Sequence, residues 1–235
     1  VKKRRNKNRY FGEKANMLNM VVFGDVHNQI NYIDKIKELP SADWTIITGD
    51  LTNCGGKKEA EEIINYIRYY NTHILAQIGN MDFLEINDYF ENLGINLHGH
   101  GYRLEEELAV FGVGGSTPTP FNTPTEYSEQ EIAAFLYTAY EEVKNVSHKI
   151  LVSHTPPFGT KVDIVRRGEH VGSRVIREFI EKEQPELCLT GHIHEARNID
   201  KIGKTLILNP GTIAQGYILV EWDGIALNAT LASYK

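Results

Sequence analysis

The sequence predicts a single α/β domain. Short runs of β-branched and aliphatic residues alternate with helical patterns through the first half of the chain, which is typical of βαβ units around a mostly parallel sheet. The chain has 235 residues, of which 41% are hydrophobic and 24% charged, and these values fit one large globular domain. Polar residues follow several of the predicted strands, where the loops of a parallel sheet form ligand sites.

The first half should contain three strands and two helices. The strands are expected at residues 18–23, 44–48 and 73–78, where β-branched and aliphatic side chains gather. The first helix should carry one apolar side and end at a proline, the residues being Ile30, Ile33, Ile36, Leu39 and Pro40. The second helix is expected near residues 59–69, with Ile63, Ile64 and Ile67 on one face.

Beyond residue 95, residues 102–104 and 109–113 form short runs bounded by turns, which favours a second, more antiparallel set of strands. Further strands are expected at residues 150–153, 187–190, 204–208, 217–222 and 225–231. Residues 112–124 are rich in glycine and proline and must form a loop. Helices are expected at residues 128–144, where Ser128 and Glu131 have the spacing of a capping box, and at residues 172–183.

The charge is distributed unevenly along the chain. Residues 1–16 contain seven Lys and Arg and one Glu, a net charge of +6, which leaves −12 on residues 17–235. We expect a basic N-terminal extension over residues 1–16, followed by the folded domain over residues 17–235. Because affinity for nucleic acid depends on Lys and Arg, we expect contact with nucleic acid only through that extension.

Other features favour a cytoplasmic protein without a membrane partner. No apolar run approaches the roughly 18 residues of a membrane span, and the N-terminus lacks the apolar region of a signal peptide. The two cysteines, Cys54 and Cys188, cannot frame a disulfide scaffold in a chain of this length.

Five loops place an Asp, Asn or His directly after a predicted strand. They contain Asp25-Val26-His27, Gly49-Asp50, Gly79-Asn80, Ser153-His154 and Gly191-His192-Ile193-His194. One such residue alone would more often be a turn former or cap, but five together indicate a metal site. The preceding glycines allow the close approach of backbone that such a site needs. Imidazole and carboxylate ligands suit Mn, Fe, Co, Ni or Zn better than Mg or Ca.

These five blocks resemble the calcineurin-like metallophosphoesterase superfamily, whose pattern is DxH, GDxx, GN(H/C)(D/E), (S/G)H and GHxH. The resemblance covers residues 19–212. Asn209-Pro210-Gly211-Thr212 is similar to the turn after the last motif in the small archaeal and bacterial phosphodiesterase branch, which includes the retromer subunit. The resemblance implies a four-layer α/β/β/α sandwich with two mixed β-sheets and a site formed by loops at one edge of both.

The resemblance also implies a site for two divalent transition-metal ions. Carried over residue by residue, one ion would be held by Asp25, His27 and His194, the other by Asn80, His154 and His192, and both by Asp50. Two ions flanking a phosphate neutralise its oxygens, and a metal-bridging hydroxide would attack it. Asp50 and Asn80 would thereby act in catalysis as well as in metal binding. Asp82 is expected to orient a neighbour rather than bind metal.

Met81 departs from the superfamily pattern. Many relatives have His here, which contacts the phosphate and helps to protonate the leaving group. A thioether cannot donate a proton, so we expect poor leaving groups to react less well. His170, in the polar loop of residues 166–173, is a candidate catalytic substitute that precedes a helix N-terminus. The alternative is that His170 and its arginine neighbours are solvated loop residues.

The implied function is hydrolysis of a phosphodiester, such as a nucleotide or cyclic nucleotide. The alternatives are a phosphomonoesterase or protein phosphatase, and a non-catalytic scaffold of the same fold. Because all seven expected positions hold competent ligands, catalysis is favoured over a scaffold. His98 and His100 are expected to form a polar turn, and His73 and His148 are assigned no role. A homodimer is the favoured assembly.

Overall fold

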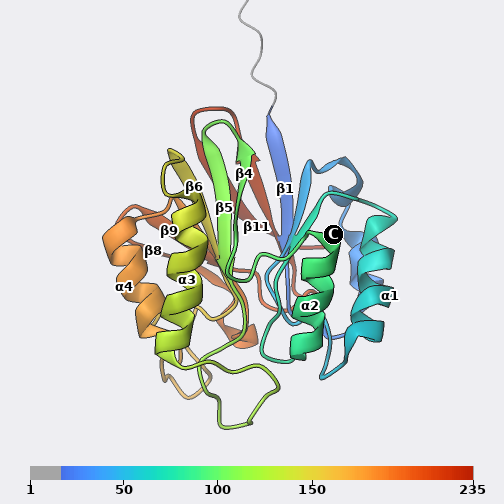
Figure 1. Cartoon of the computed structure of the whole chain (residues 1–235), viewed down its shortest axis with the longest axis horizontal. Coiled ribbons are helices and arrows are strands. Elements are labelled where there is room, and N and C mark those ends of the chain that lie inside the picture. Colours follow the sequence, from blue (N-terminus) through green and yellow to red (C-terminus); the bar gives the residue numbers. More distant parts are fainter. Residues whose placement is uncertain (1–16, 235) are drawn as a thin grey trace, which may run out of the picture.

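The computed structural model describes residues 17–234. The basic segment 1–16, with the nucleic-acid contact expected of it, lies outside the described residues. The described chain forms four layers, in which two sheets pack face to face and helices cover both outer faces (Figure 1). This arrangement confirms the fold class that the resemblance implied.

The first sheet has five strands in the order β11-β10-β1-β2-β3. Their bounds are β1 (Leu18–Phe23), β2 (Trp44–Ile47), β3 (Ile74–Ala76), β10 (Tyr217–Trp222) and β11 (Leu227–Ala232). The strands β1, β2 and β3 run parallel, whereas β10 is antiparallel to both of its neighbours. The sheet is therefore mixed.

The second sheet has six strands in the order β4-β5-β6-β7-β9-β8. Their bounds are β4 (Gly101–Glu105), β5 (Leu108–Val113), β6 (His148–Ser153), β7 (Leu187–Thr190), β8 (Asn198–Ile202) and β9 (Thr205–Asn209). Its four central strands are parallel, and only β4 and β8 at its edges pair antiparallel. The expected antiparallel pairing is confirmed for β4 with β5, whereas β5, β6 and β7 run parallel because α3 and α4 provide the crossovers that parallel strands need.

Within residues 17–234, four α-helices cover the sheets. They are α1 (Lys57–Arg68) and α2 (Leu84–Leu93) on the first sheet and α3 (Glu129–Val143) and α4 (Arg174–Glu183) on the second, seen on opposite sides in Figure 1. The predicted capping box is confirmed, since the Ser128 hydroxyl accepts the Glu131 N–H and Glu131 accepts the Ser128 N–H. Within the described residues no helix is long and apolar enough to cross a membrane.

The alternation of side chains along the strands builds three apolar layers. In β1, Val21 and Phe23 face the helices, whereas Met20 and Val22 face the other sheet. In β6, Ile150 and Val152 face the first sheet, and Leu151 faces α3 and α4. Because strands buried on both faces carry apolar residues at successive positions, they appear in the sequence as unbroken hydrophobic runs.

The helix predicted after β1 is absent from the described structure, which has two short 3₁₀ helices, η1 (Ile30–Lys35) and η2 (Leu39–Ser41), instead. Gln29 provides no side-chain cap, and Ile36 is already extended. Pro40 lies within the first turn of η2, where its missing N–H is tolerated, rather than ending a helix. Ile33, Ile36 and Leu39 are buried as expected, but Ile30 is exposed. Neither α2 nor β8 was predicted from the sequence.

Candidate metal centre

The five loops that the sequence singled out meet at one edge of both sheets. They follow β1, β2, β3, β6 and β7. The N–H groups of Asp25 and Val26 donate to the carbonyls of Gly49 and Asp50, which joins two loops of the first sheet. The Gly191 N–H donates to the His154 carbonyl in the second sheet, and the Gly115 N–H donates across to Ile78. Backbone hydrogen bonds therefore fix the loops before any ligand binds.

Four of the predicted ligand residues have a left-handed backbone. Their φ angles are 48° at Asp25, 46° at His27, 51° at Asp50 and 67° at His192. Residues other than glycine seldom adopt positive φ, although Asp and His do so more often than most. Such conformations persist where the surrounding structure holds them, and they gather at functional sites.

Three glycines pack directly against candidate ligands. A Cβ atom at Gly49 would lie 2.5 Å from His154 Nδ1, and one at Gly191 would lie 2.5 Å from Asp25 Oδ2. A Cβ atom at Gly79 would collide with the Asp50 carboxylate. The glycines therefore leave room for the functional side chains of neighbouring loops.

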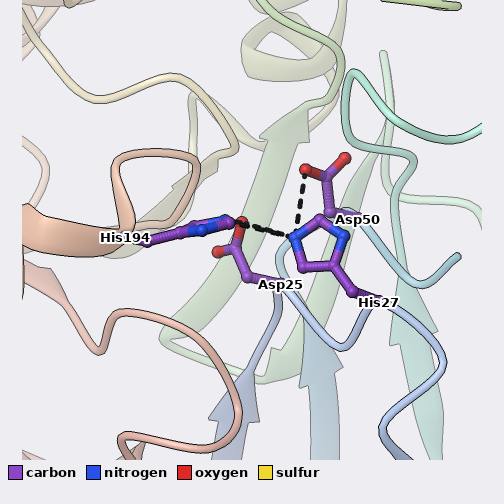
Figure 2. Close-up of side chains that lie close together, drawn as sticks. All are labelled: Asp25, His27, Asp50 and His194. Atoms are coloured by element: carbon purple, nitrogen blue, oxygen red, sulfur yellow. Dashed lines mark hydrogen bonds and ion pairs between the residues drawn. The ribbon is translucent and has the colours of Figure 1, made fainter. Parts of the chain in front are cut away.

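The side chains of Asp25, His27, Asp50 and His194 converge, with one potential ligand atom of each within 4.8 Å of the others (Figure 2). We call these residues ligand group 1. The Nε2 atoms of His27 and His194 lie 3.1 Å apart, and His194 Nε2 lies 3.1 Å from Asp25 Oδ1. His27 Nε2 lies 3.8 Å from a carboxylate oxygen of each aspartate.

A second set of side chains shares Asp50 with the first. Ligand atoms of Asp50, His154 and His192 also lie within 4.8 Å of one another. Asn80 joins them, because its Oδ1 atom lies 3.1 Å from His154 Nε2. We call these four residues ligand group 2. All seven predicted ligand positions are thus brought together, and Asp50 lies between the two groups.

The donor atoms of ligand group 2 fit a cation. His154 Nδ1 lies 3.1 Å from the Thr48 carbonyl, which can only accept, so this nitrogen carries a proton. In the neutral ring, Nε2 then presents a lone pair toward Asn80 Oδ1 and Asp50 Oδ2, at 3.1 and 3.4 Å. Three lone pairs that face one another repel unless a positive charge lies between them. The geometry therefore suits a proton or a metal ion at this point.

The charges of ligand group 2 depend on one another. Burial alone would raise the pKa of Asp50, but the charge of His154 and its hydrogen bond outweigh burial and lower that pKa to about 2. Burial disfavours the charged ring of His154, but Asp50 raises the pKa of His154 to about 9. Burial and the charge of His154 lower the pKa of His192 to about 4, so His192 is neutral and competent to bind metal.

Asp82 holds two of the loops together and, among the described residues, its carboxylate makes no hydrogen bond to the side chain of a predicted metal ligand. Its carboxylate accepts the N–H groups of Leu51, Thr52 and Gly79 and the Thr52 hydroxyl, at 2.8 to 3.1 Å. Burial, followed by the nearby charge of Asp50, raises its pKa to about 6. Asp82 therefore fixes the loop that carries Asp50 relative to the loop that carries Asn80. At Met81 the backbone N–H donates to Asp50 Oδ1 at 2.7 Å.

His170 belongs to neither ligand group. Among the described residues it makes no hydrogen bond to a predicted metal ligand, and its Nδ1 atom lies 2.7 Å from Asp163 Oδ1. Its loop is nonetheless close to the centre, because the Arg166 N–H donates to Glu195, the neighbour of His194, at 3.3 Å. The His170 side chain is 36% exposed, whereas Asp163 is fully buried.

The histidines outside the centre have other surroundings. His98 is only 6% exposed, its Nδ1 atom accepts the Gly114 N–H, and its ring stacks on Tyr127. It is therefore a buried packing residue rather than part of a polar turn, which corrects the expectation for it. His100 pairs with Glu91. His73 lies against Trp44 and His148 against Trp222.

The sequence did not reveal the supporting roles of three residues. The Asn209 amide donates to the carbonyls of Val162, Gly191 and Ile193, which supports the loop of His192 and His194. Asp163 accepts the N–H groups of Gly159, Thr160 and Gly172, and the Thr123 hydroxyl accepts an N–H from the Asn80 amide. Only Asn209, in its Asn-Pro-Gly turn, carried a local sequence signal.

Comparisons with known proteins agree with this site. A family described as calcineurin-like phosphoesterase matches residues 18–196. The uncharacterized protein MJ1162 of Methanocaldococcus jannaschii is 40% identical over 173 residues, which are 72% of this chain and 77% of that protein. The UPF0046 protein K07C11.7 of Caenorhabditis elegans is 26% identical over 218 residues, 85% of this chain and 71% of its own length.

Two solved structures share the fold. TT1561 of Thermus thermophilus has a TM-score of 0.67 at 17% identity, over 92% of this chain and 99% of that protein. A dimetal phosphatase from Danio rerio has a TM-score of 0.62 at 7% identity, over 93% of this chain and 99% of that protein. The fold, the converging candidate ligands and the extent of the sequence match lead to one assignment: the chain belongs to the calcineurin-like phosphoesterase family.

Proposed function

We propose that this protein is a phosphodiesterase that uses two divalent transition-metal ions. The observation that carries the proposal is the position of Asp50, whose carboxylate belongs to both ligand groups. A shared carboxylate is typical of sites that hold two ions a few ångströms apart. Ligand group 1 would hold one ion and ligand group 2 the other, and Mn, Fe, Co, Ni and Zn suit the mixture of imidazole and oxygen ligands.

When bound, the ions would neutralise phosphate oxygens and supply a water of lowered pKa as the nucleophile. The protein would hold the ligand side chains in fixed positions and would leave part of the positive charge of the ions uncompensated. Asp25 and Asp50 are the carboxylates of the two groups, so they cancel only half of the charge of two divalent ions. With both ions bound the centre would keep a net positive charge that attracts an anionic phosphate, and the low dielectric around the buried Asp25 and Asp50 would strengthen that attraction.

The residues that follow Asn80 in the chain favour a diester over a monoester. The next residue is Met81, whose side chain is half-buried, followed closely by the exposed Phe83 and Leu84. A diester presents one negative charge and a second organic group to the site, whereas a monoester presents a second negative charge. An apolar neighbourhood is better suited to the organic group.

His170 is the candidate proton donor to the leaving group. The buried Asp163 carboxylate accepts the Nδ1 proton, so the ring is oriented and its Nε2 atom is left to act on substrate. Three backbone N–H groups fix Asp163 in turn. A hydrogen bond from the Arg166 N–H of the same loop to Glu195, the neighbour of His194, supports this role.

The proposal is tested with Mn²⁺-loaded protein and two aryl substrates, bis(p-nitrophenyl) phosphate and p-nitrophenyl phosphate. We expect kcat/KM for the diester to exceed that for the monoester. Asp50→Asn and His154→Ala should each lower the rate by about 100-fold or more. Asp34→Asn is the matched control, because Asp34 is a surface carboxylate bound only by the hydroxyls of Tyr66 and Tyr70 in the described structure. Equal rates in all three variants would overturn the proposal.

The role of His170 is tested by varying the leaving group. His170→Ala should slow diesters with alkyl leaving groups by about 100-fold but leave p-nitrophenyl esters nearly unchanged, because only a poor leaving group needs a proton. His100→Ala is the control, since His100 also lies 2.8 Å from a carboxylate and is 37% exposed. A uniform loss for all leaving groups would assign His170 to the structure of the loop instead.

A further inference from the structure

The amide of Asn80 is held from both ends. Its Oδ1 atom lies 3.1 Å from His154 Nε2, within ligand group 2. Its Nδ2 atom lies 3.0 Å from the Thr123 hydroxyl, which belongs to the Gly- and Pro-rich loop between β5 and α3. An asparagine can bind a metal ion only through its oxygen, so the orientation of this amide matters for the site.

Glu126 determines the direction in which the Thr123 hydroxyl donates its proton. Its Oε1 atom accepts the hydroxyls of Thr119 and Thr123, each at 2.6 Å, and the Thr123 N–H at 2.8 Å. Burial opposes its charge, but these hydrogen bonds lower the pKa of Glu126 to about 2. An ionised carboxylate only accepts, so the single hydroxyl proton of Thr123 goes to Glu126.

The Thr123 oxygen consequently faces Asn80 with a lone pair. It can accept an N–H from the amide, but it cannot donate to the amide oxygen. The NH₂ end of Asn80 is therefore fixed toward Thr123, and the oxygen is fixed toward His154. The reversed amide would set two lone pairs against each other at Thr123 and would direct two N–H groups into ligand group 2, where they would repel a cation.

The backbone holds the Thr123 hydroxyl in place. The Thr125 N–H donates to the Asn80 carbonyl at 3.0 Å, and the Thr125 hydroxyl donates to the Asp82 carbonyl at 2.5 Å. The loop is closed on itself where the N–H groups of Ser116 and Tyr127 pair with the carbonyls of Thr125 and Ser116. The contact between Asn80 and Thr123 is thus part of a fixed network.

We propose that Thr123, held by Glu126, is a positioning residue that keeps the Asn80 amide oxygen turned toward the metal ion of ligand group 2. This inference rests on the proposed two-metal function. It assigns to the loop between β5 and α3 a part in metal affinity, although no residue of that loop would itself bind metal.

The chain offers a closely matched pair of variants. Thr123→Val removes the hydroxyl with little change of shape and frees the Asn80 amide to reverse. Thr119→Val removes a hydroxyl that donates to the same Glu126 oxygen, but Thr119 makes no hydrogen bond to Asn80 in the described structure. Thr123→Ser restores the hydroxyl. Glu126→Gln is a second way to release the Asn80 amide. The Gln NH₂ group can donate to the Thr123 oxygen, and the Thr123 hydroxyl proton can then turn toward Asn80.

The experiment titrates the metal-free 235-residue protein with Mn²⁺ and follows binding by calorimetry, with thermal unfolding recorded for each variant. We expect wild-type protein to bind two ions. Thr123→Val and Glu126→Gln should each weaken one ion by about 10- to 100-fold and leave the other unchanged. Thr123→Ser and Thr119→Val should bind both ions as wild type does.

Two results would overturn the inference while the proposed function stands. One is wild-type affinity for both ions in Thr123→Val or in Glu126→Gln. The other is the same loss in Thr119→Val as in Thr123→Val, which would indicate a general effect on the loop. Failure of wild-type protein to bind any Mn²⁺ would instead contradict the proposed two-metal function itself.

Discussion

The Nε2 atoms of His27 and His194 lie 3.1 Å apart although 167 positions separate the two residues in the chain. His27 follows β1 of one sheet, and His194 follows β7 of the other. Two neutral imidazoles at this distance can share one proton or bind one cation between them, but two facing lone pairs would repel. A metal ion in ligand group 1 would therefore link the loops of both sheets.

Metal binding should accordingly stabilise the fold. At a free concentration of 100 times its Kd, one Mn²⁺ adds about 2.7 kcal/mol to the free energy of unfolding, equivalent to a rise in Tm of about 5 to 10 °C for a domain of this size. Thermal unfolding with Mn²⁺ and with a chelator measures the difference. Asp50→Asn should remove most of the rise, and an unchanged Tm in wild-type protein would contradict the expectation.

Gly79→Ala should damage the metal centre, because its Cβ atom would collide with the Asp50 carboxylate. We expect Mn²⁺ affinity to fall by at least about tenfold. Gly94→Ala is the contrasting variant. Gly94 ends α2 with φ 67° and has open space around it, so alanine there should cost about 1 kcal/mol of stability and leave Mn²⁺ affinity intact. Unchanged Mn²⁺ affinity of Gly79→Ala would contradict this expectation and would show that the loop shifts to make room for the added Cβ atom.

Asp82→Asn should destabilise the fold by about 1 to 3 kcal/mol. Asp82 accepts four hydrogen bonds with two oxygens, whereas Asn has one accepting oxygen and would leave buried N–H groups unpaired. Urea unfolding of the metal-free protein measures the loss. Asp34→Asn, at an exposed carboxylate, serves as the control, and equal stability of the two variants would count against this role of Asp82.

The pH dependence of stability should include a contribution from Glu126. Its pKa falls from an ordinary value of 4.5 to about 2 on folding, so the folded state binds its proton less tightly. The resulting stability is fully present above about pH 4.5 and is lost as the pH falls toward 2. The difference in unfolding free energy between wild-type protein and Glu126→Gln should therefore shrink from pH 6 to pH 3. A difference that stays constant would exclude the linkage.

Much of the fold was predictable because its core strands are apolar on both faces. The prediction for β1 agrees with the observed bounds, and the Ser128 capping box marked the start of α3. The spacing of apolar residues after β1 led to the wrong prediction of an α-helix. Ile33, Ile36 and Leu39 lie in or beside 3₁₀ turns, whose three residues per turn are close to the period of an α-helix. The pairing of β5 with β6 depends on tertiary contacts and could not be read from local patterns.

For the site, the sequence predicted the ligand residues but not the network that holds them. Asp25 and His192 were recognisable by residue type, by the turns around them and by the resemblance. Thr123 and Asp163 are common residues in irregular loops, and their partners lie 43 and 7 positions away. Their roles follow from hydrogen bonds that exist only once the loops have folded.

In the proposed enzyme, one chain holds two metal ions that share Asp50. Anomalous diffraction from crystals of the Mn²⁺-loaded protein tests this arrangement most directly. We expect two peaks per chain, one about 2 to 2.3 Å from ligand atoms of Asp25, His27 and His194 and one at that distance from ligand atoms of Asn80, His154 and His192, with Asp50 in contact with both. A single peak, or peaks away from Asp50, would contradict it.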